Sequence, residues 1–199
     1  MKALEDVPFD GWTWDVIESA AEKAGHDKTV AFAVFPEKLE DVMPHFSDLA
    51  DRKMLEILKT QEMPEKIRDK IKQAVLARYE FLNGHKEATR AATNYWLVFT
   101  RKIEASKLVW KTADIIWKYA GDTSNDYNHY TKRTLLSGVI TATNIAWLND
   151  DSANHQKTKE FLDRRIENVL FVGKGAGKIL GPILGKMEFL KPKRAGECS

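Results

Sequence analysis

The chain has little cysteine, little net charge and no long apolar run. Its one cysteine, Cys198, cannot form a disulfide within the chain, so we expect a reducing compartment. No apolar run reaches the roughly 18 residues that a transmembrane helix needs. The net charge of +2 over 199 residues gives no electrostatic reason to expect a nucleic-acid partner. These absences are typical of one globular domain with an ordinary core.

The first residues also lack the composition of a targeting signal. The segment MKALEDVPFDGW has too many acids for a secretory signal and lacks the arginine bias of a transit peptide. We therefore predict a cytoplasmic protein, attached peripherally to the inner face of the membrane by the tail described below.

Catalytic and metal-binding motifs are missing as well. Asp126 and His129 form a lone acid-x-x-His pair, whereas a di-iron bundle needs two Glu-x-x-His pairs and two further carboxylates. The histidines have no zinc-like spacing and no cysteine beside them. Residues 173–178 look superficially like a phosphate loop but lack the Walker spacing. The sequence therefore predicts no enzyme, no metal site and no cofactor.

What the sequence does contain is helical periodicity, with no alternation typical of strands. Gly25 is a natural end for the first predicted helix, because glycine adopts positive φ without penalty. Together with a C-terminal amphipathic helix, the segments predict an all-α bundle of about nine or ten helices. The predicted helices cover residues 12–24, 30–35, 37–60, 64–83, 85–101, 107–119, 125–148 and 155–172.

The helix predicted at 125–148 is apolar on more than one side. Leu135 and Val139 belong to one stripe, and Leu136 and Ile140 belong to the next. So wide an apolar arc indicates neighbours on both sides, or neighbours together with a second subunit or a ligand. A homodimer interface built with the following helix and a plain monomeric core are both open at this point.

The tail after residue 172 is basic and amphipathic. It carries more positive charge than the whole chain, which suits an anionic bilayer surface. Docking of this helix on its own domain is the alternative. Pro182 should kink or divide the helix, and glycines at every fourth position weaken it in water, so we expect order on contact with lipid. The predicted membrane-contact residues are Lys178, Ile179, Leu180, Ile183, Leu184, Lys186, Met187 and Leu190.

The densest group of polar and aromatic residues spans 112–133 and predicts a corner between two helices. Gly121 should end the first helix, and the side-chain oxygens of residues 122–126 should cap the second. A capped corner with ion pairs explains Asp122 and Asp126, but three nearby rings are costly to expose unless something covers them. The candidate partners of the two acids are Lys132, Arg133, Arg164 and Arg165; the rings are Tyr127, His129 and Tyr130.

At this corner the sequence resembles the ubiquinone-biosynthesis accessory protein family, the ninth of the Coq proteins. The resemblance is carried by AGDTSNDYNHYTKR at 120–133, with ADIIWKY before it and FLDRRIENV at 161–169, and by the opening VPFDGWTWDVIESAAEKAG. It implies a TetR-like all-α homodimer with an apolar lipid-binding cavity and a C-terminal helix that meets the membrane. The implied role is to present a quinone intermediate to a di-iron demethoxyquinone hydroxylase, without catalysis.

The resemblance also implies site residues. In the family, an aromatic pair after Asp-Phe-Asn forms the surface for the hydroxylase; here His129 replaces the usual Trp and Tyr127 replaces the Phe. The implied partner-binding residues are Ile116, Trp117, Tyr127, His129 and Tyr130. The residues that fit a cavity lining are Trp110, Ile115, Leu136, Val139, Ile140 and Trp147, for each of which core packing is the alternative.

We divide the chain into three regions and weigh two rival functions. Residues 1–60 hold N-terminal helices with a degenerate helix-turn-helix-like region, 61–172 the lipid-binding and dimerisation region, and 173–199 the membrane-contact tail. A TetR-like DNA-binding regulator needs a basic recognition helix, yet HDKTVAFAVFPEKLEDVMPHF is apolar and not net basic, so we expect no nucleic-acid partner. A general lipid carrier unrelated to quinones is the second rival.

Overall fold

The computed structural model describes residues 2–169, and within them the chain is helical and contains no strand. This confirms the all-α prediction; the predicted C-terminal helix and tail lie outside the described residues. A further helix covers residues 156–169. The preceding elements are α1 (Ala3–Asp10), α2 (Trp14–Lys23), α3 (Lys28–Val34), α4 (Leu39–Leu58), α5 (Ile67–Asn83), α6 (Lys86–Leu97), the 3₁₀ turn η1 (Phe99–Arg101), α7 (Lys102–Tyr119), α8 (Tyr127–Leu148) and the 3₁₀ turn η2 (Ala153–His155).

Several helix ends differ from the predicted ones. α1 was not predicted, because Pro8 inside it removes a backbone hydrogen bond; burial of Leu4 and Val7 in the core compensates for that loss. α5 begins at Ile67 rather than at Pro64. The helix predicted over 85–101 is interrupted at Val98, whose backbone is extended, and α7 therefore starts earlier than predicted.

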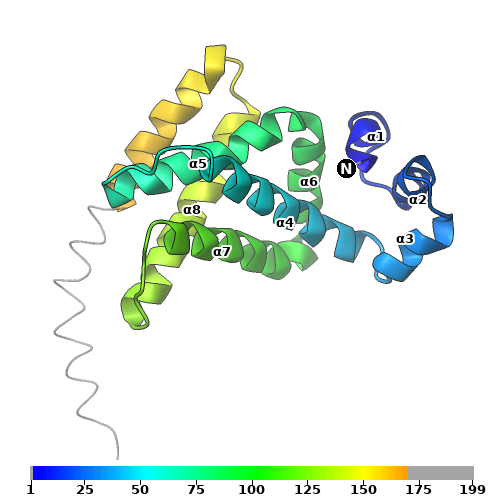
Figure 1. Ribbon diagram of the computed structural model, residues 1–199, viewed down its shortest axis with the longest axis horizontal. Coiled ribbons are helices and arrows are strands. Elements are labelled where there is room, and N and C mark those ends of the chain that lie inside the picture. Colours follow the sequence, from blue (N-terminus) through cyan, green and yellow to red (C-terminus); the bar gives the residue numbers. More distant parts are fainter. Residues whose placement is uncertain (1, 170–199) are drawn as a thin grey trace, which may run out of the picture.

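The N-terminal helices α1, α2 and α3 lie together at one end of the molecule, and the 156–169 helix lies near the other end (Figure 1). Trp12 ties the N-terminal group to the body of the protein. Its indole N–H donates to the Ala88 carbonyl at 2.9 Å, and its ring lies 5.1 Å from that of Phe46. These contacts join the N-terminal group to α6 and α4.

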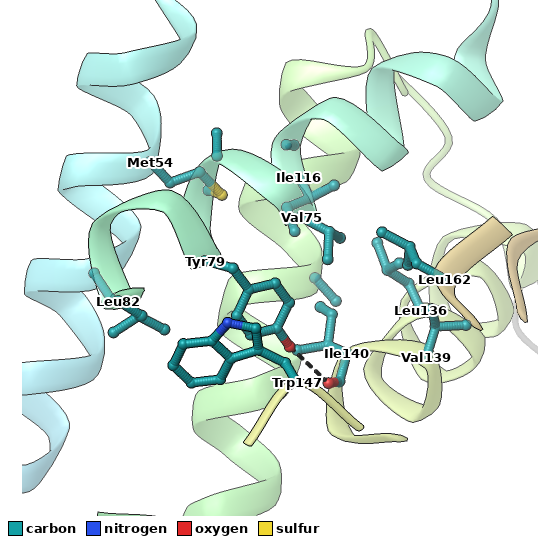
Figure 2. Packing of buried hydrophobic residues seen from close by; sticks show 14 of the residues in the cluster. Met54, Val75, Tyr79, Leu82, Ile116, Leu136, Val139, Ile140, Trp147 and Leu162 are labelled. Atoms are coloured by element: carbon teal, nitrogen blue, oxygen red, sulfur yellow. Dashed lines mark hydrogen bonds between the residues drawn. The ribbon is translucent and has the colours of Figure 1, made fainter. Parts of the chain in front are cut away.

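The centre of the core is a set of large side chains from different helices, drawn in Figure 2. Trp147 is 0% exposed, stacks on Tyr79 at 5.1 Å and donates its indole N–H to Asn83 at 2.9 Å. The Tyr79 hydroxyl donates to the Ile140 carbonyl, and Leu162 of the last helix packs in the same cluster. In this part of the core, the hydrogen bonds of Trp147 and Tyr79 join α5 to α8.

The predicted division near residue 60 falls between α4 and α5, but the main hydrophobic cluster extends across it. Met54 of α4 is 0% exposed in the same cluster as Tyr79 of α5. Within residues 2–169, no helix is both long enough and apolar enough to cross a bilayer.

Candidate functional site

A cavity of about 970 Å³ lies between α4, α5, α6, α7 and α8. At its inner end the walls are buried residues of α4 and α5, including Met43 and Leu82. At its outer end Leu97 is 64% exposed and Ile145 is 53% exposed, so the cavity opens to the surface there. The volume is within the range of roughly 300–1,000 Å³ that ligand sites occupy in proteins.

Beside larger residues such as Trp110 and Ile140, the walls that α7 and α8 contribute to the cavity include several small residues. On α8 these are Ser137, Gly138 and Thr141, and on α7 the wall includes Ala105 and Ser106. A Cβ atom built on Gly138 would meet nothing within 4 Å, so the space beside this residue is open. Small side chains at helical spacing leave a gap that larger ones would fill.

Several hydroxyl groups in the wall already donate a hydrogen bond within their own helix, so they offer no free proton to a ligand. Ser137 donates to the Arg133 carbonyl at 2.8 Å, and Thr141 donates to the Ser137 carbonyl at 2.9 Å. Thr93 likewise donates to the carbonyl of Thr89 at 2.9 Å. Because each of these protons is bound within its own helix, most of the wall has little hydrogen-bonding demand and suits an apolar ligand.

One group in the wall is strongly polar. Arg78 of α5 donates from Nε to Asp51 of α4 at 2.8 Å and from Nη2 to the Ser47 hydroxyl at 3.2 Å. The Thr112 hydroxyl of α7 donates to the same carboxylate at 2.9 Å. Arg78, Ser47 and Thr112 all line the cavity, and the Asp51 side chain is buried behind them. We call these four residues the polar anchor.

The predicted lining residues are placed in different surroundings. Trp110 and Ile140 line the cavity. Leu136, Val139 and Trp147 are buried in the main core instead, and Ile115 is partly buried against it. The apolar stripes of α8 marked mainly the core face of that helix; Ile140 of one stripe lines the cavity together with the smaller Ser137, Gly138 and Thr141. Residues of α4 and α6 in the wall were not predicted, since nothing local marks them as neighbours of α8.

The corner between α7 and α8 is built as its sequence indicated. Gly121 has a φ of +90°, and the next N–H, of Asp122, returns to the Trp117 carbonyl at 3.0 Å to close α7. Asp126 opens α8 by accepting a hydrogen bond from the Asn128 N–H at 3.0 Å. The predicted end of α7 and the predicted cap at Asp126 are therefore confirmed, whereas Asp122, also expected to cap α8, accepts from Lys132 and Arg133 instead.

Charged side chains hold this corner together. Arg133 is 2% exposed, and it donates to Asp114 at 2.7 Å and to Asp122 at 3.0 Å. Lys132 also pairs with Asp122, so both of these predicted pairings are confirmed. Burial opposes ionisation of Asp122, but hydrogen bonds, with that from Lys132 the largest, prevail and lower its pKa to about 2.

The predicted partner-binding residues divide into exposed and buried ones. Tyr127 is 49% exposed and Tyr130 is 62% exposed. His129 is half-buried, and its Nδ1 lies 3.0 Å from the Ser124 carbonyl oxygen. Ile116, at 0% exposure, belongs to the core rather than to the surface, because it lies on the face of α7 that packs inward.

Trp117 is also buried, and its indole N–H donates to the Lys132 carbonyl at 3.1 Å. The exposed Tyr130 in turn lies beside the cavity wall, with its ring 6.2 Å from that of Trp110. The exposed ring of Tyr130 at the corner is therefore a neighbour of the Trp110 ring in the cavity wall.

The predicted membrane-contact residues, from Lys178 to Leu190, lie outside the described residues. Within 2–169, His, Cys, Asp and Glu side chains nowhere gather in the number that a metal site requires.

Together these features define a class: an α-helical bundle that contains a mostly apolar cavity. A crystal structure of a TetR transcriptional regulator from Nitrosomonas europaea matches this fold with a TM-score of 0.64. The match covers 85% of this chain and 94% of that chain, at 19% sequence identity. The predicted TetR-like fold is thereby confirmed.

Within that class, the chain is similar to the COQ9 proteins, as its resemblance indicated. The COQ9 family model matches residues 103–173, which include all of α7 but its first residue, the corner and α8. The rat ubiquinone biosynthesis protein COQ9, mitochondrial, is 27% identical over 185 residues, covering 89% of this chain and 59% of its own length. The human protein of that name is 26% identical, covering 89% and 58%.

The Drosophila melanogaster protein is 30% identical over 173 residues, covering 84% of this chain and 53% of its own length. The chain thus spans less than two thirds of each of these relatives.

Proposed function

We propose that this protein is a non-catalytic accessory protein of ubiquinone biosynthesis. It binds a quinone intermediate in the cavity and presents it, at the membrane, to a di-iron demethoxyquinone hydroxylase. The observation that carries the proposal is the cavity of about 970 Å³, with a mostly apolar wall, in a relative of the COQ9 ubiquinone biosynthesis proteins. An apolar tail gains free energy on leaving water for such a wall.

The direct test is native mass spectrometry of the purified full chain, followed by extraction and identification of bound lipid. We expect a homodimer that carries an isoprenoid quinone or a related lipid. A protein that holds no lipid and takes none from vesicles would overturn the proposal. A bound phospholipid with no quinone uptake would favour the general lipid carrier.

The variant Gly138→Leu tests whether the cavity is the binding site. Its side chain would project into open space in the cavity, because a Cβ at Gly138 meets nothing within 4 Å. Replacing a glycine inside a helix also removes a helix-propensity cost of up to about 1 kcal/mol, so we expect an equal or higher melting temperature. Lipid binding should nevertheless fall by about tenfold or more.

Gly84→Leu is the matched control for that variant. Gly84 has right-handed helical backbone angles, and a Cβ there would meet only the Phe81 carbonyl oxygen, at 3.8 Å. The residue does not line the cavity, so this variant should bind lipid as the native protein does. Equal binding by both variants would place the ligand elsewhere.

Presentation to the hydroxylase is supported by the exposed rings of Tyr127 and Tyr130 at the corner. Large exposed aromatic side chains are frequent anchors of protein interfaces. We expect Tyr130→Ala to weaken binding of the purified hydroxylase by about tenfold, measured by surface plasmon resonance, with little change in lipid binding. Unchanged hydroxylase affinity would remove this surface from the proposal.

We expect the N-terminal helices not to bind DNA. The helix α3 exposes Phe32 to 54% and Val34 to 59%, which gives a phosphate backbone little to bind. A salt-dependent shift of random duplex DNA by this protein would favour the regulator instead.

The predicted peripheral membrane attachment is tested by flotation of the full chain with anionic and neutral vesicles. Equal recovery with both would contradict the proposed role of the basic tail.

A further inference from the structure

The polar anchor is unlike the rest of the cavity wall. The side chain of Arg78 is 14% exposed and that of Asp51 is 4% exposed, so the pair lies in a place where ions are costly. The wall lysines, Lys102 and Lys107, are exposed by contrast. Apolar residues of similar volume often replace such a buried pair without loss of stability, so a structural link between helices does not by itself require it.

The hydrogen bonds within the anchor leave Arg78 and Ser47, which both line the cavity, with donors that have no partner among the described residues. The Asp51 carboxylate accepts from Arg78 and Thr112, so its charge is bound behind the wall. Arg78 has five N–H groups, of which one on Nε and one on Nη2 are bound within the described residues. The Ser47 oxygen accepts from Arg78, and its own hydroxyl proton is bound by none of the described side chains.

We propose that Arg78 and Ser47 bind the oxygen of a neutral polar head group at the inner end of the cavity. This inference rests on the proposed function, and it assigns an orientation to the ligand. The head lies among the buried residues of α4 and α5, and the apolar tail runs toward the exposed end at Leu97. A carbonyl, quinone or ether oxygen accepts from both donors without bringing a charge into the protein.

The charge of the anchor selects the class of head group. Asp51 already neutralises Arg78, so a carboxylate or phosphate bound there would leave an uncompensated negative charge in a buried site. A pure hydrocarbon would leave the two donors without an acceptor, which is also unfavourable. A neutral oxygen acceptor satisfies the donors and keeps the site neutral.

The test compares three ligands of similar size on the full chain by isothermal titration calorimetry. They are decyl-1,4-benzoquinone, decylbenzene and 4-decylbenzoate, which share a ten-carbon tail and differ in the head. We expect the native protein to bind the quinone roughly tenfold more tightly than either comparator, as one hydrogen bond from a charged donor implies.

The single variant Arg78→Met would leave the buried Asp51 carboxylate without its cationic partner, so it is a poor test. The double variant Asp51→Leu with Arg78→Met removes both charges and the donors together. It should bind decylbenzene as the native protein does and lose the preference for the quinone. Ser47→Ala should reduce that preference in part.

Thr141→Val is the control, because its hydroxyl lines the cavity but donates within α8; the preference should be unchanged in this variant. Retention of the preference by the double variant, or equal binding of all ligands by the native protein, would overturn the anchor and leave the cavity function standing. Tighter binding of 4-decylbenzoate would overturn the neutral head group. Failure of every ligand to bind the native protein would overturn the proposed function as well.

Discussion

One face of helix α8 packs in the filled core, and another face borders the cavity. On one face Leu136 and Trp147 are buried among large side chains from α4, α5, α7 and the last described helix (Figure 2). On the other face Ser137, Gly138 and Thr141 border a cavity of about 970 Å³. One helix therefore borders both a filled core and a cavity, and on the cavity side its small residues lie beside the larger Ile140 and Ile145.

The two faces also differ in how their polar atoms are bound. In the solid core, Trp147 and Tyr79 donate to atoms of other segments, at Asn83 and Ile140, and so connect α5 with α8. In the cavity wall, Ser137 and Thr141 donate to carbonyls of their own helix. Stability should therefore come mainly from the solid face, and ligand binding from the hollow one.

The largest effect that tests this difference should come from Trp147→Ala. The indole is fully buried, stacked on Tyr79 and hydrogen-bonded to Asn83, so its removal should lower the free energy of unfolding by about 3–5 kcal/mol. The measurement is urea unfolding followed by circular dichroism.

Trp110→Ala removes the same side chain from the cavity wall and is the matched control. Trp110 is partly exposed and already borders empty space, so its loss should lower the free energy of unfolding much less. Lipid affinity, measured by calorimetry, should fall instead. Equal losses of stability in the two variants would show that the hollow face supports the fold as strongly as the solid one.

The next effect concerns the corner, which joins the ends of two cavity walls, α7 and α8. Arg133→Ala leaves Asp114 and Asp122 without their buried partner, and we expect a loss of about 3 kcal/mol by urea unfolding. Lipid affinity should fall too, because the walls lose this connection. Lys118→Ala is the control: its side chain is 68% exposed, and the loss should stay below about 1 kcal/mol.

Acid should weaken the same corner. The pKa of Asp122 is about 2 in the folded protein against 3.8 in the unfolded one, so its stabilisation is present above about pH 4 and is lost as the pH falls toward 2. We expect this group to contribute about 2 kcal/mol of the loss between these pH values. Urea titrations of the native protein and of Asp122→Asn measure the contribution, and equal pH dependence in the two would contradict it.

The helices could be predicted where the cause is local. The interval 37–60 anticipated α4 at Leu39–Leu58, and Gly25 and Gly121 do have positive φ where helices end. α1 could not be predicted, because its residues Leu4 and Val7 are stabilised by a core that forms from distant segments. The charged corner was predictable for the same reason as the helix ends, since its partners are close in sequence.

The cavity wall was less predictable than the corner. The apolar stripes of α8 show which side chains leave water, but not whether a large neighbour or a void faces them. Leu136 and Ile140 lie on adjacent turns, yet only Ile140 lines the cavity. The polar anchor, with Asp51 and Arg78 on separate helices, has no local sequence signal at all.

The smallest expected change in stability comes from removing one hydroxyl group from each face of α8. The Thr143 hydroxyl is buried in the solid core and has no hydrogen-bond partner among the described residues. Thr143→Val keeps the shape of the side chain and removes an unpaired polar atom, so it should raise the free energy of unfolding by about 1 kcal/mol. Thr141→Val, on the cavity face, removes a hydroxyl that is exposed and bonded to Ser137, and should change it by less than about 0.5 kcal/mol. Parallel urea titrations measure both variants. If Thr143→Val lowers the free energy of unfolding, the Thr143 hydroxyl has a partner in the native protein, for example a buried water molecule. The solid face would then be less tightly filled than its side chains indicate.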